Sequence, residues 1–336
     1  MSGDFFLTQW AFLGMRWLYE TLTNESIVWT VILSTLIIRC ATVFGDIRSR
    51  KTSMKMQLIQ PQLQKIQKKY ANDPQRLSVE QRKLMKDNDV SMFGGCLPML
   101  FTLPIFFIFI AAFRQWGYEM QAKLIVEMEA DPVKGIEFFR NFKFLWVNNM
   151  WSPDNGFKPV VMQASEFFSA AMKNLPNLLY FKENPEALKT FVKLGFFTET
   201  DGVYALASVT EELTARYDAL LKPCMDLYAG HNNGWFVFPV LAAATTFFSS
   251  WIMMKGQNQN KKDADGKSNP ADAAQNTGKM MTWLMPLMSF YFCLVSNATF
   301  ALYWTASNVF STLSTLILNR HFAKTISAPA EVKEIK

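Results

Sequence analysis

Residues 27–44 read IVWTVILSTLIIRCATVF, and this stretch decides the fold. It is almost entirely apolar, and roughly 20 such residues are enough for a helix to cross the hydrocarbon core of a bilayer. The stretch therefore predicts a transmembrane helix. Its one charged side chain, Arg39, costs about 2.5–3.5 kcal/mol at the centre of such a helix, and less where it faces protein or water.

Arg39 belongs to a polar stripe on this helix. Thr35, Arg39 and Thr42 lie four and three residues apart, so they share one face, and Asp46 continues that face beyond the apolar run. The pattern predicts a wetted surface inside the membrane. The alternative is that Arg39 snorkels to the interface, because only ~7.5 Å of helix separates it from Phe44. Snorkelling needs no neighbouring hydroxyls, so the stripe favours the wetted surface.

The composition fits a membrane protein with long polar segments. Of the 336 residues, 50% are hydrophobic and 18% are charged, yet the mean hydropathy is only +0.05. The four cysteines show neither a disulfide framework nor metal-ligand spacing, and the two histidines have no zinc-binding motif. No phosphate loop or Ser/His/Asp arrangement is visible. We therefore expect no cofactor, no metal and no enzymatic activity.

The apolar runs along the chain predict an all-α polytopic membrane protein with five transmembrane helices. Basic loops after the first and third spans place the N-terminus outside and the C-terminus in the cytoplasm, which predicts a multi-pass membrane protein. The predicted parts are an interfacial amphipathic helix (1–25), the first transmembrane helix (26–45), a cytoplasmic helical hairpin (46–93), the second transmembrane helix (94–116), a long helical extracytoplasmic segment (117–234), the third transmembrane helix (235–254), a flexible cytoplasmic loop (255–279), the fourth and fifth transmembrane helices (280–318) and a cytoplasmic tail (319–336).

Two of these parts have an alternative interpretation. Residues 1–25 could instead hold a first spanning helix, although Arg16 and Glu20 interrupt the aromatic run. The region 46–93 could be a basic loop that only sets the topology. Its apolar residues recur close to heptad spacing, and an Asn72–Asp73–Pro74 turn follows them, which favours a built hairpin.

Prolines and charges set the remaining predicted boundaries. The second span is expected to end at Arg114, and the fourth span is expected to be broken by Pro286. In the extracytoplasmic segment, helical patterns cover residues 164–174 and 209–221. Breaks are expected there at Pro132, Pro153, Pro176, Pro185 and Pro223.

Polar residues also follow the third and fifth predicted spans. They are Thr246 and Ser250 on the third span, and Thr305, Asn308 and Thr312 on the fifth. If these faces converge with the stripe on the first span, the five helices enclose a hydrophilic groove around Arg39.

Three segments carry a resemblance to a known family. They are LIIRCATVFGDIRSRKTSMKMQLIQPQLQKIQKKY (36–70), GGCLPMLFTLPIFFIFIAAF (94–113) and LYWTASN (302–308). The first resembles the first span and cytoplasmic hairpin of the YidC-type insertases, which include the mitochondrial Oxa and chloroplast Albino proteins. The second resembles that family's second span, and the third the start of its last span.

The resemblance implies a membrane protein insertase and chaperone of the bacterial plasma (inner) membrane that uses no cofactor. Short hydrophilic tails of clients would enter the groove, and their apolar segments would leave sideways into the bilayer. Nascent membrane proteins, the ribosome, the lipid bilayer and possibly the Sec translocon are the implied partners. The implied groove residues are Arg39, Thr35, Thr42, Thr246, Ser250, Tyr303, Trp304 and Asn308, and the implied contact residues of the hairpin are Lys55, Gln60, Lys65 and Lys68.

Two other functions were weighed against an insertase. A small-solute transporter would use Arg39 to bind an anionic substrate, but the predicted spans hold no carboxylate for proton coupling and no inverted repeat is evident. An intramembrane protease needs a nucleophile with a base, and neither His231 nor His321 lies in a predicted span.

Overall fold

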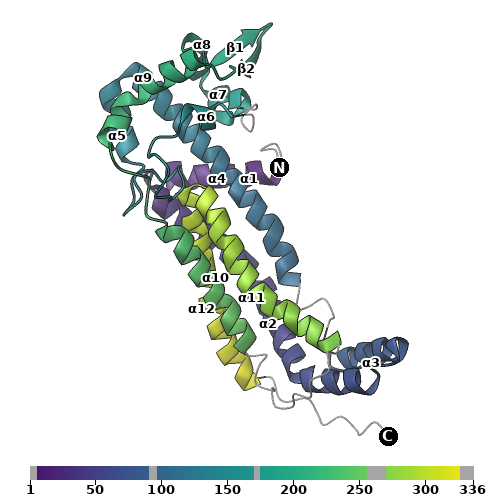
Figure 1. Cartoon of the computed structure of the whole chain (residues 1–336). Coiled ribbons are helices and arrows are strands. Elements are labelled where there is room, and N and C mark those ends of the chain that lie inside the picture. The colour runs from purple at the N-terminus through teal and green to yellow at the C-terminus, as the bar shows by residue number, and fades with distance from the viewer. Residues whose placement is uncertain (1–5, 91–96, 170–174, 256–269, 326–336) are drawn as a thin grey trace. The chain divides into compact units, whose positions relative to one another are not determined.

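A computed structural model describes residues 6–90, 97–169, 175–255 and 270–325 (Figure 1). The chain divides into two compact units. The first comprises Met1–Val31, Ile108–Val240 and Tyr291–Tyr303, and the second comprises Ile32–Phe107, Leu241–Phe290 and Trp304–Lys336. Each unit is described by itself.

The described residues are mostly helical. In chain order the elements are α1 (Phe6–Thr21), α2 (Ile27–Lys69), α3 (Pro74–Asp87), α4 (Leu97–Ala130), α5 (Pro132–Arg140), α6 (Ala164–Phe167), the 3-10 helix η2 (Leu175–Asn177), α7 (Leu179–Glu183), α8 (Pro185–Lys193), β1 (Phe197–Thr200), β2 (Val203–Leu206), α9 (Glu211–Leu227), α10 (Val237–Lys255), α11 (Pro270–Val295) and α12 (Ala298–Thr325).

Helix α2 carries the strongest membrane signal. Within the described residues, Ile27–Met56 is long and apolar enough to cross a bilayer, and Val237–Ile252 and Trp283–Val295 are shorter apolar helices. Helix α2 runs without a break to Lys69, so no turn marks the predicted end of the span at residue 45, and that boundary stays a prediction. A helix needs no turn where it leaves an apolar layer, since the polar residues that follow can continue it in water. The five-span count stays a prediction.

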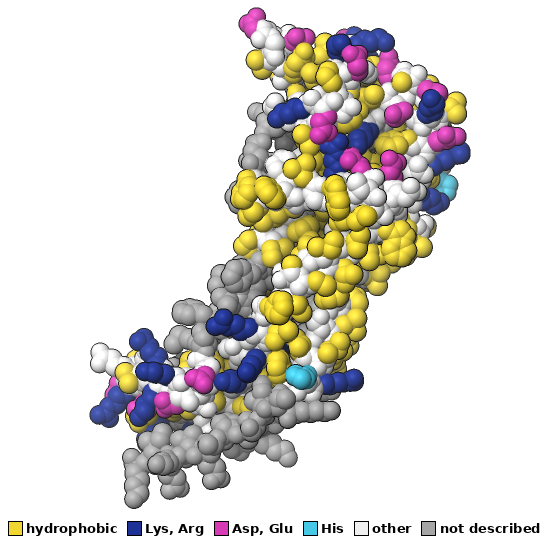
Figure 2. Space-filling model, turned by 180° about the vertical axis from the view of Figure 1, so that it is seen from behind, with side chains coloured by type: hydrophobic (Ala, Val, Ile, Leu, Met, Phe, Trp, Pro, Cys, Tyr) yellow, Lys and Arg dark blue, Asp and Glu magenta, His cyan; other side chains and the backbone are white. Residues whose placement is uncertain are grey.

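The second unit contains a helical hairpin at the end of α2. The Asp73 side chain accepts a hydrogen bond from the Arg76 backbone N–H at 3.0 Å, and Pro74 occupies the first turn of α3, which together start that helix. Ile59, Leu63 and Ile66 of α2 form one apolar cluster with Leu84 and Val90. Figure 2 shows Lys and Arg side chains gathered over this hairpin. Residues 91–93, the end of the predicted hairpin, lie outside the described part.

Two predicted interruptions of helices do not occur. Helix α11 passes through Pro286, and helix α9 passes through Pro223 and ends at Leu227. A proline inside a helix removes one hydrogen bond but does not end a helix that is held by packing on both sides. Residues 270–279, predicted as flexible loop, belong to α11, while residues 256–269 of that loop and 326–336 of the tail lie outside the described part.

In the first unit, α4 continues well beyond Arg114, where the second span was expected to end. It reaches Ala130, because the side chains that follow Arg114 pack against other residues of the first unit and the chain makes no turn there. The Trp116 ring contacts the rings of Phe12 and Tyr19 on α1, with centroids 6.5 and 5.4 Å apart. Helix α1 is therefore fixed on one side of α4.

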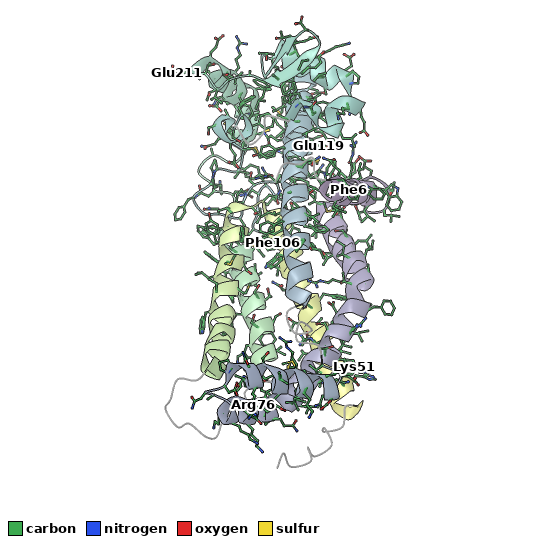
Figure 3. All side chains as sticks on the ribbon, turned by 90° about the vertical axis from the view of Figure 1, so that its right-hand side faces the viewer. Phe6, Lys51, Arg76, Phe106, Glu119 and Glu211 are labelled. Carbon is green, nitrogen blue, oxygen red and sulfur yellow. The ribbon has the colours of Figure 1, made fainter. Side chains whose placement is uncertain are left out.

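A buried carboxylate lies beside this contact (Figure 3). Glu119 on α4 is fully buried, and its Oε1 lies 3.8 Å from Arg16 Nε and 3.5 Å from Lys123 Nζ. Arg16 also pairs with Glu20 at 2.8 Å and with Glu183 at 2.6 Å. Burial raises the pKa of Glu119, while the neighbouring cations oppose that rise.

The rest of the first unit is a small lobe with an aromatic core, in which Phe167, Phe191 and Phe196 are completely buried. The pattern at 164–174 yields only α6, and residues 170–174 lie outside the described part. The antiparallel pair β1–β2 is an element that the all-α expectation did not include. Cys224, which stood in a polar segment of the sequence, is buried in α9, and burial raises the pKa of its thiol to about 12.

Candidate functional site

The guanidinium of Arg39 reaches from α2 to α12 in the second unit. Its Nε donates to Ser307 Oγ at 3.0 Å, and its Nη2 also donates to that oxygen. Ser307 is buried, whereas Arg39 is half-buried. Thr35, one turn earlier on α2, is buried, and Thr42 Oγ1 donates back to the Arg39 carbonyl at 3.3 Å. A hydroxyl of the neighbouring helix α12 therefore holds the Arg39 guanidinium.

A second arginine repeats this contact further along the same two helices. Arg50 Nη2 donates to Thr315 Oγ1, and Thr315 is buried on α12. The sequence alone had placed Arg50 among the charges of the cytoplasmic loop. Ser307 and Thr315 are eight residues apart, so they lie on the same side of α12. Helix α12 thus presents two hydroxyls to two arginines of α2.

Another face of α12 joins α10 and α11 through a connected set of hydrogen bonds. Asn308 Nδ2 donates to Thr246 Oγ1 at 2.8 Å, and Thr246 Oγ1 donates to Ser289 Oγ at 3.0 Å. The indole Nε1 of Trp304 donates to the same Ser289 Oγ at 3.2 Å. The structure therefore brings together three of the expected groove residues, Thr246, Trp304 and Asn308, around a serine of α11. The same Trp304 ring contacts the Phe106 ring, with centroids 4.8 Å apart.

On α10, Ser249 makes a side-chain contact with α12 next to the expected groove residue Ser250. Ser249 Oγ is hydrogen-bonded to Thr312 Oγ1 of α12, and Ser250 is half-buried beside it on α10. We call the polar contacts of Arg39, Thr246, Ser249, Ser289, Trp304, Ser307, Asn308 and Thr312 the polar seam.

Tyr303 is not part of the polar seam. It belongs to the first unit, where only 3% of its surface is exposed. Its ring stacks on Phe109 with centroids 4.7 Å apart and an interplanar angle of 13°, and it also contacts Phe113 and Phe300. These contacts place the Tyr303 ring in an aromatic cluster, and its role in the groove stays a prediction.

The four expected hairpin residues do not form one cluster. Lys55 Nζ lies 3.5 Å from the Asn88 carbonyl and 3.9 Å from Asp89, so it ties α2 to the end of α3. Gln60, Lys65 and Lys68 are exposed on α2. The exposed residues are available to a partner, whereas Lys55 has a local partner already.

Sequence reasoning missed Ser289, Ser307 and the contact of Arg50. Ser289 and Ser307 carry small hydroxyls within predicted spans, where such residues also occur without a function. Arg50 is one of several cations in the predicted cytoplasmic hairpin, where a solvent-exposed charge is the simpler interpretation. For Ser307 a signal existed, since it lies between Trp304 and Asn308 within the LYWTASN segment. For Ser289 the sequence showed only a single hydroxyl in an apolar run.

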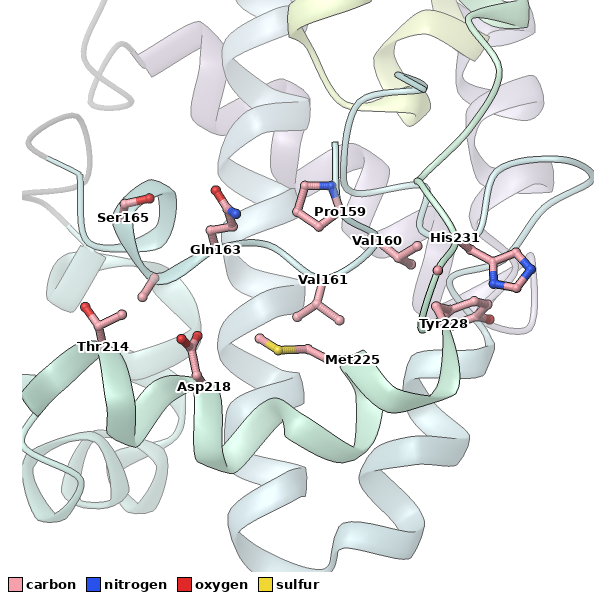
Figure 4. A pocket seen from close by; sticks show the side chains of 12 residues that line it. Pro159, Val160, Val161, Gln163, Ser165, Thr214, Asp218, Met225, Tyr228 and His231 are labelled. Atoms are coloured by element: carbon pink, nitrogen blue, oxygen red, sulfur yellow. The ribbon is translucent and has the colours of Figure 1, made fainter. Parts of the chain in front are cut away.

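A separate pocket lies in the first unit, with a volume of about 450 Å³ (Figure 4). Helix α9 and the segment 159–165 line it, and Val161 and Met225 supply apolar surface beside Asp218 and His231. None of its lining residues belongs to the polar seam. Among the described residues, no group of three or more His, Cys, Asp or Glu side chains is placed to hold a metal ion. We therefore place the candidate site at the polar seam.

Comparison with known proteins agrees with the membrane character of these helices. The model of the 60Kd inner membrane protein family matches residues 17–200 and 202–325. The chain belongs to this family. It is therefore a membrane protein, and the family's name describes proteins of the bacterial inner membrane.

Relatives of the chain carry the name membrane protein insertase YidC. The protein from Clostridium perfringens is 32% identical over 144 residues, which cover 43% of this chain and 52% of the relative. The protein from Clostridium tetani is 34% identical over 151 residues, covering 45% and 59%. The protein from Endomicrobium trichonymphae is 36% identical over 116 residues, covering 34% and 22%. The chain thus spans about half the length of the two clostridial relatives and less of the third.

Proposed function

We propose that the chain is a membrane protein insertase that admits short hydrophilic tails of client proteins into a wet groove within the bilayer. The apolar segment of each client then leaves the groove sideways into lipid. The observation that carries this proposal is the half-buried guanidinium of Arg39, held by Ser307 among apolar helices. The relatives named as insertases support the same conclusion.

The proposed topology follows the charge distribution. Five spans would cross the inner membrane, with the N-terminus outside and the C-terminus in the cytoplasm. The basic hairpin of α2 and α3 would then lie in the cytoplasm, as expected for cationic loops. The lobe that contains α5 and α9 would lie outside, where a long translocated segment is not governed by its lysines.

The mechanism needs no covalent step. Polar groups without partners lose several kcal/mol when they enter hydrocarbon, at about 4–8 kcal/mol for an amide or hydroxyl moved from water to cyclohexane. A wet groove lets a tail travel part of the way still solvated, which lowers the remaining barrier. The apolar segment gains about 25 cal/mol for each Å² that it removes from water. The groove therefore lowers a barrier, and burial of the client supplies the driving force.

Arg39 gives the groove a preference for acidic tails. Two unit charges ~4 Å apart attract by about 4 kcal/mol at an effective dielectric of 20, before desolvation is subtracted. The membrane potential acts in the same direction, at about 2.3 kcal/mol per 100 mV for an anion that moves outward across an inside-negative membrane. A basic tail meets both terms with the opposite sign.

The test is insertion of one client into vesicles that contain the purified chain, with the tail charge varied from acidic to basic and the potential set to zero. Arg39→Ala should remove most of the preference for acidic tails, and Arg39→Lys should keep much of it. Arg48→Ala is the matched control, because Arg48 is exposed on the same helix. If Arg39→Ala inserts acidic and basic tails in the wild-type ratio, attraction by the arginine is not part of the mechanism.

We further propose that the cytoplasmic hairpin receives clients and their delivery machinery, including the ribosome and the Sec translocon. Its exposed cations, such as Lys65 and Lys68, fit an anionic partner such as ribosomal RNA. Deleting residues 55–86 should lower insertion while the remaining helices stay folded. Normal insertion by a stable deletion variant would reduce the hairpin to a topology signal.

A further inference from the structure

A tight turn in the first unit exposes an apolar tip. The backbone N–H and carbonyl of Phe144 pair with those of Val147, at 2.9 and 3.0 Å, so Leu145 and Trp146 form the tip between them. Leu145 has a φ of 52°, and 61% of its surface is exposed. Turn tips in water favour Gly, Asn and Asp, because these tolerate this backbone and carry no large apolar side chain. A strained and exposed leucine at this position points to a surface other than water.

A second turn repeats the pattern. The Asn155 side chain accepts from the Phe157 backbone N–H at 2.9 Å, and the Lys158 N–H donates to the Asn155 carbonyl at 3.1 Å. Phe157 stands at this tip with 86% of its surface exposed. A side chain of this size left in water forgoes the stabilisation that burial would give it.

Aromatic contacts hold both tips against the residues where α10 begins. The Trp146 ring lies against Phe238, with centroids 4.9 Å apart, and the Phe157 ring meets Phe236 edge-on at 5.3 Å. Gly156 permits the second contact, because a Cβ there would lie 2.7 Å from the Phe236 ring. Trp235, directly before α10, is 77% exposed. Leu145, Phe157 and Trp235 therefore stand at the level of the first turn of α10.

We propose that Leu145, Phe157 and Trp235 form an outer-leaflet anchor, which inserts into the headgroup region of the lipid bilayer around the third span. The start of a span is where aromatic side chains meet lipid headgroups. Lys143, beside the first tip, is exposed, so an anionic headgroup complements its charge, whereas Lys158 beside the second tip pairs with Glu166 at 3.5 Å. The two tips are convex turns, and a convex apolar surface fits a lipid layer better than it fits a polypeptide segment, which binds in a groove. This anchor is independent of the polar seam and of the insertion activity, and only its assignment to the outer leaflet rests on the proposed topology.

Photo-crosslinking in the full-length chain tests the anchor. Benzoyl-phenylalanine replaces Leu145 or Phe157, and the protein is placed in vesicles of phosphatidylethanolamine and phosphatidylglycerol. Lipid adducts are expected at both positions after irradiation, detected by mass spectrometry. Val203 is the matched control, since it is a similarly exposed apolar residue, at 67%, near the turn of the β1–β2 hairpin, and it should give no lipid adduct. Because the three replaced side chains are exposed, the substitutions leave the core unchanged.

A positive control separates this proposal from the topology. Leu287 on α11 is 66% exposed and should also give lipid adducts if α11 spans the bilayer. Lipid adducts at Leu287 with none at Leu145 and Phe157 would overturn the anchor and leave the span intact. Equal yields at Val203 and Phe157 would overturn it as well. When a client polypeptide is added to the same vesicles, adducts to it in place of lipid at Phe157 would overturn the anchor in favour of a client-binding surface.

Discussion

Removing the carboxylate of Asp154 should loosen the start of α10. This fully buried side chain accepts four hydrogen bonds. The donors are the indole Nε1 of Trp146 at 3.0 Å and the backbone N–H groups of Trp235, Phe236 and Phe238 at 2.8, 3.1 and 2.7 Å. The carboxylate thus satisfies N–H groups at the beginning of a helix that have no partner within the helix. Gly234 makes room for it, because a Cβ there would lie 2.0 Å from Asp154 Oδ1.

The size of the effect follows from these four bonds. A hydrogen bond to a charged acceptor contributes about 1.5–3 kcal/mol. The Trp235 and Phe236 N–H groups lie at a partly exposed segment, where water can replace the carboxylate, so mainly the Trp146 and Phe238 bonds are lost in full. Asp154→Ala should therefore destabilise the first unit by about 3–5 kcal/mol, in the range seen when one partner of a buried charged network is removed. Asp154→Asn keeps one carbonyl oxygen and should lie between Asp154→Ala and the wild type.

Amide hydrogen exchange on the full chain in lipid vesicles measures this loss locally. Each 1.4 kcal/mol corresponds to a tenfold change, so the Phe238 amide should exchange at least about 100-fold faster in Asp154→Ala. Asp226→Ala is the matched control, since Asp226 is an exposed acid paired with Lys222 at 3.1 Å, and its change should stay within about 0.5 kcal/mol. Unchanged exchange at Phe238 in Asp154→Ala would refute the capping role of this carboxylate.

Topology, the arginine contact and the buried carboxylate of α4 each give a direct test. A cysteine at Val203 should react with an impermeant maleimide in intact spheroplasts, above the wild-type background, whereas one at Asn72 in the hairpin turn should react only after lysis; labelling of Asn72→Cys from outside would reverse the proposed orientation. Ser307→Ala should lower insertion of acidic-tail clients less than Arg39→Ala does in the same vesicles, because the charge remains; equal losses would show that the charge acts only through its α12 contact. Glu119→Gln should raise the thermal unfolding midpoint near neutral pH, because burial raises the pKa of Glu119 and disfavours its ionised form in the folded chain. That gain should disappear as the pH falls through the raised pKa, and a gain that persists at low pH would contradict this reasoning.

Local signals in the sequence were enough to predict several elements. The apolar run around Arg39 lies in a helix, and the turn at Asn72–Pro74 lies between α2 and α3, because hydrophobic period and turn residues act over a few positions. The polar face of the last helix was predicted from the spacing of Thr305, Asn308 and Thr312. These features depend only on neighbours in the chain.

Contacts between distant segments could not be predicted in the same way. Nothing near Ser307 in the sequence shows that Arg39, 268 residues away, donates to it. The hydrogen bonds of Asp154 join a loop to a helix that starts 83 residues later. A single sequence does not distinguish a buried aspartate of this kind from an exposed aspartate in a loop. The predicted breaks at Pro223 and Pro286 were wrong for the same reason, because contacts with distant residues, such as Cys224 with Met128 and Ser289 with Thr246, help to hold each helix despite the loss of one hydrogen bond.

The donors that Ser307 leaves unused connect this geometry to the proposed activity. A guanidinium has five N–H groups, and one hydroxyl cannot accept from all of them. Arg39 is half-buried, and its Nε and Nη2 are the nitrogens that donate to Ser307. In hydrocarbon, N–H groups without an acceptor would carry a large desolvation cost, which water or the carbonyl and carboxylate oxygens of an entering tail would remove. Under the proposed function, this half-buried guanidinium, held by the Ser307 hydroxyl, would receive a polar chain inside the membrane. The Arg39→Ala insertion test distinguishes this role from snorkelling, because a snorkelling arginine would leave the preference for acidic tails unchanged.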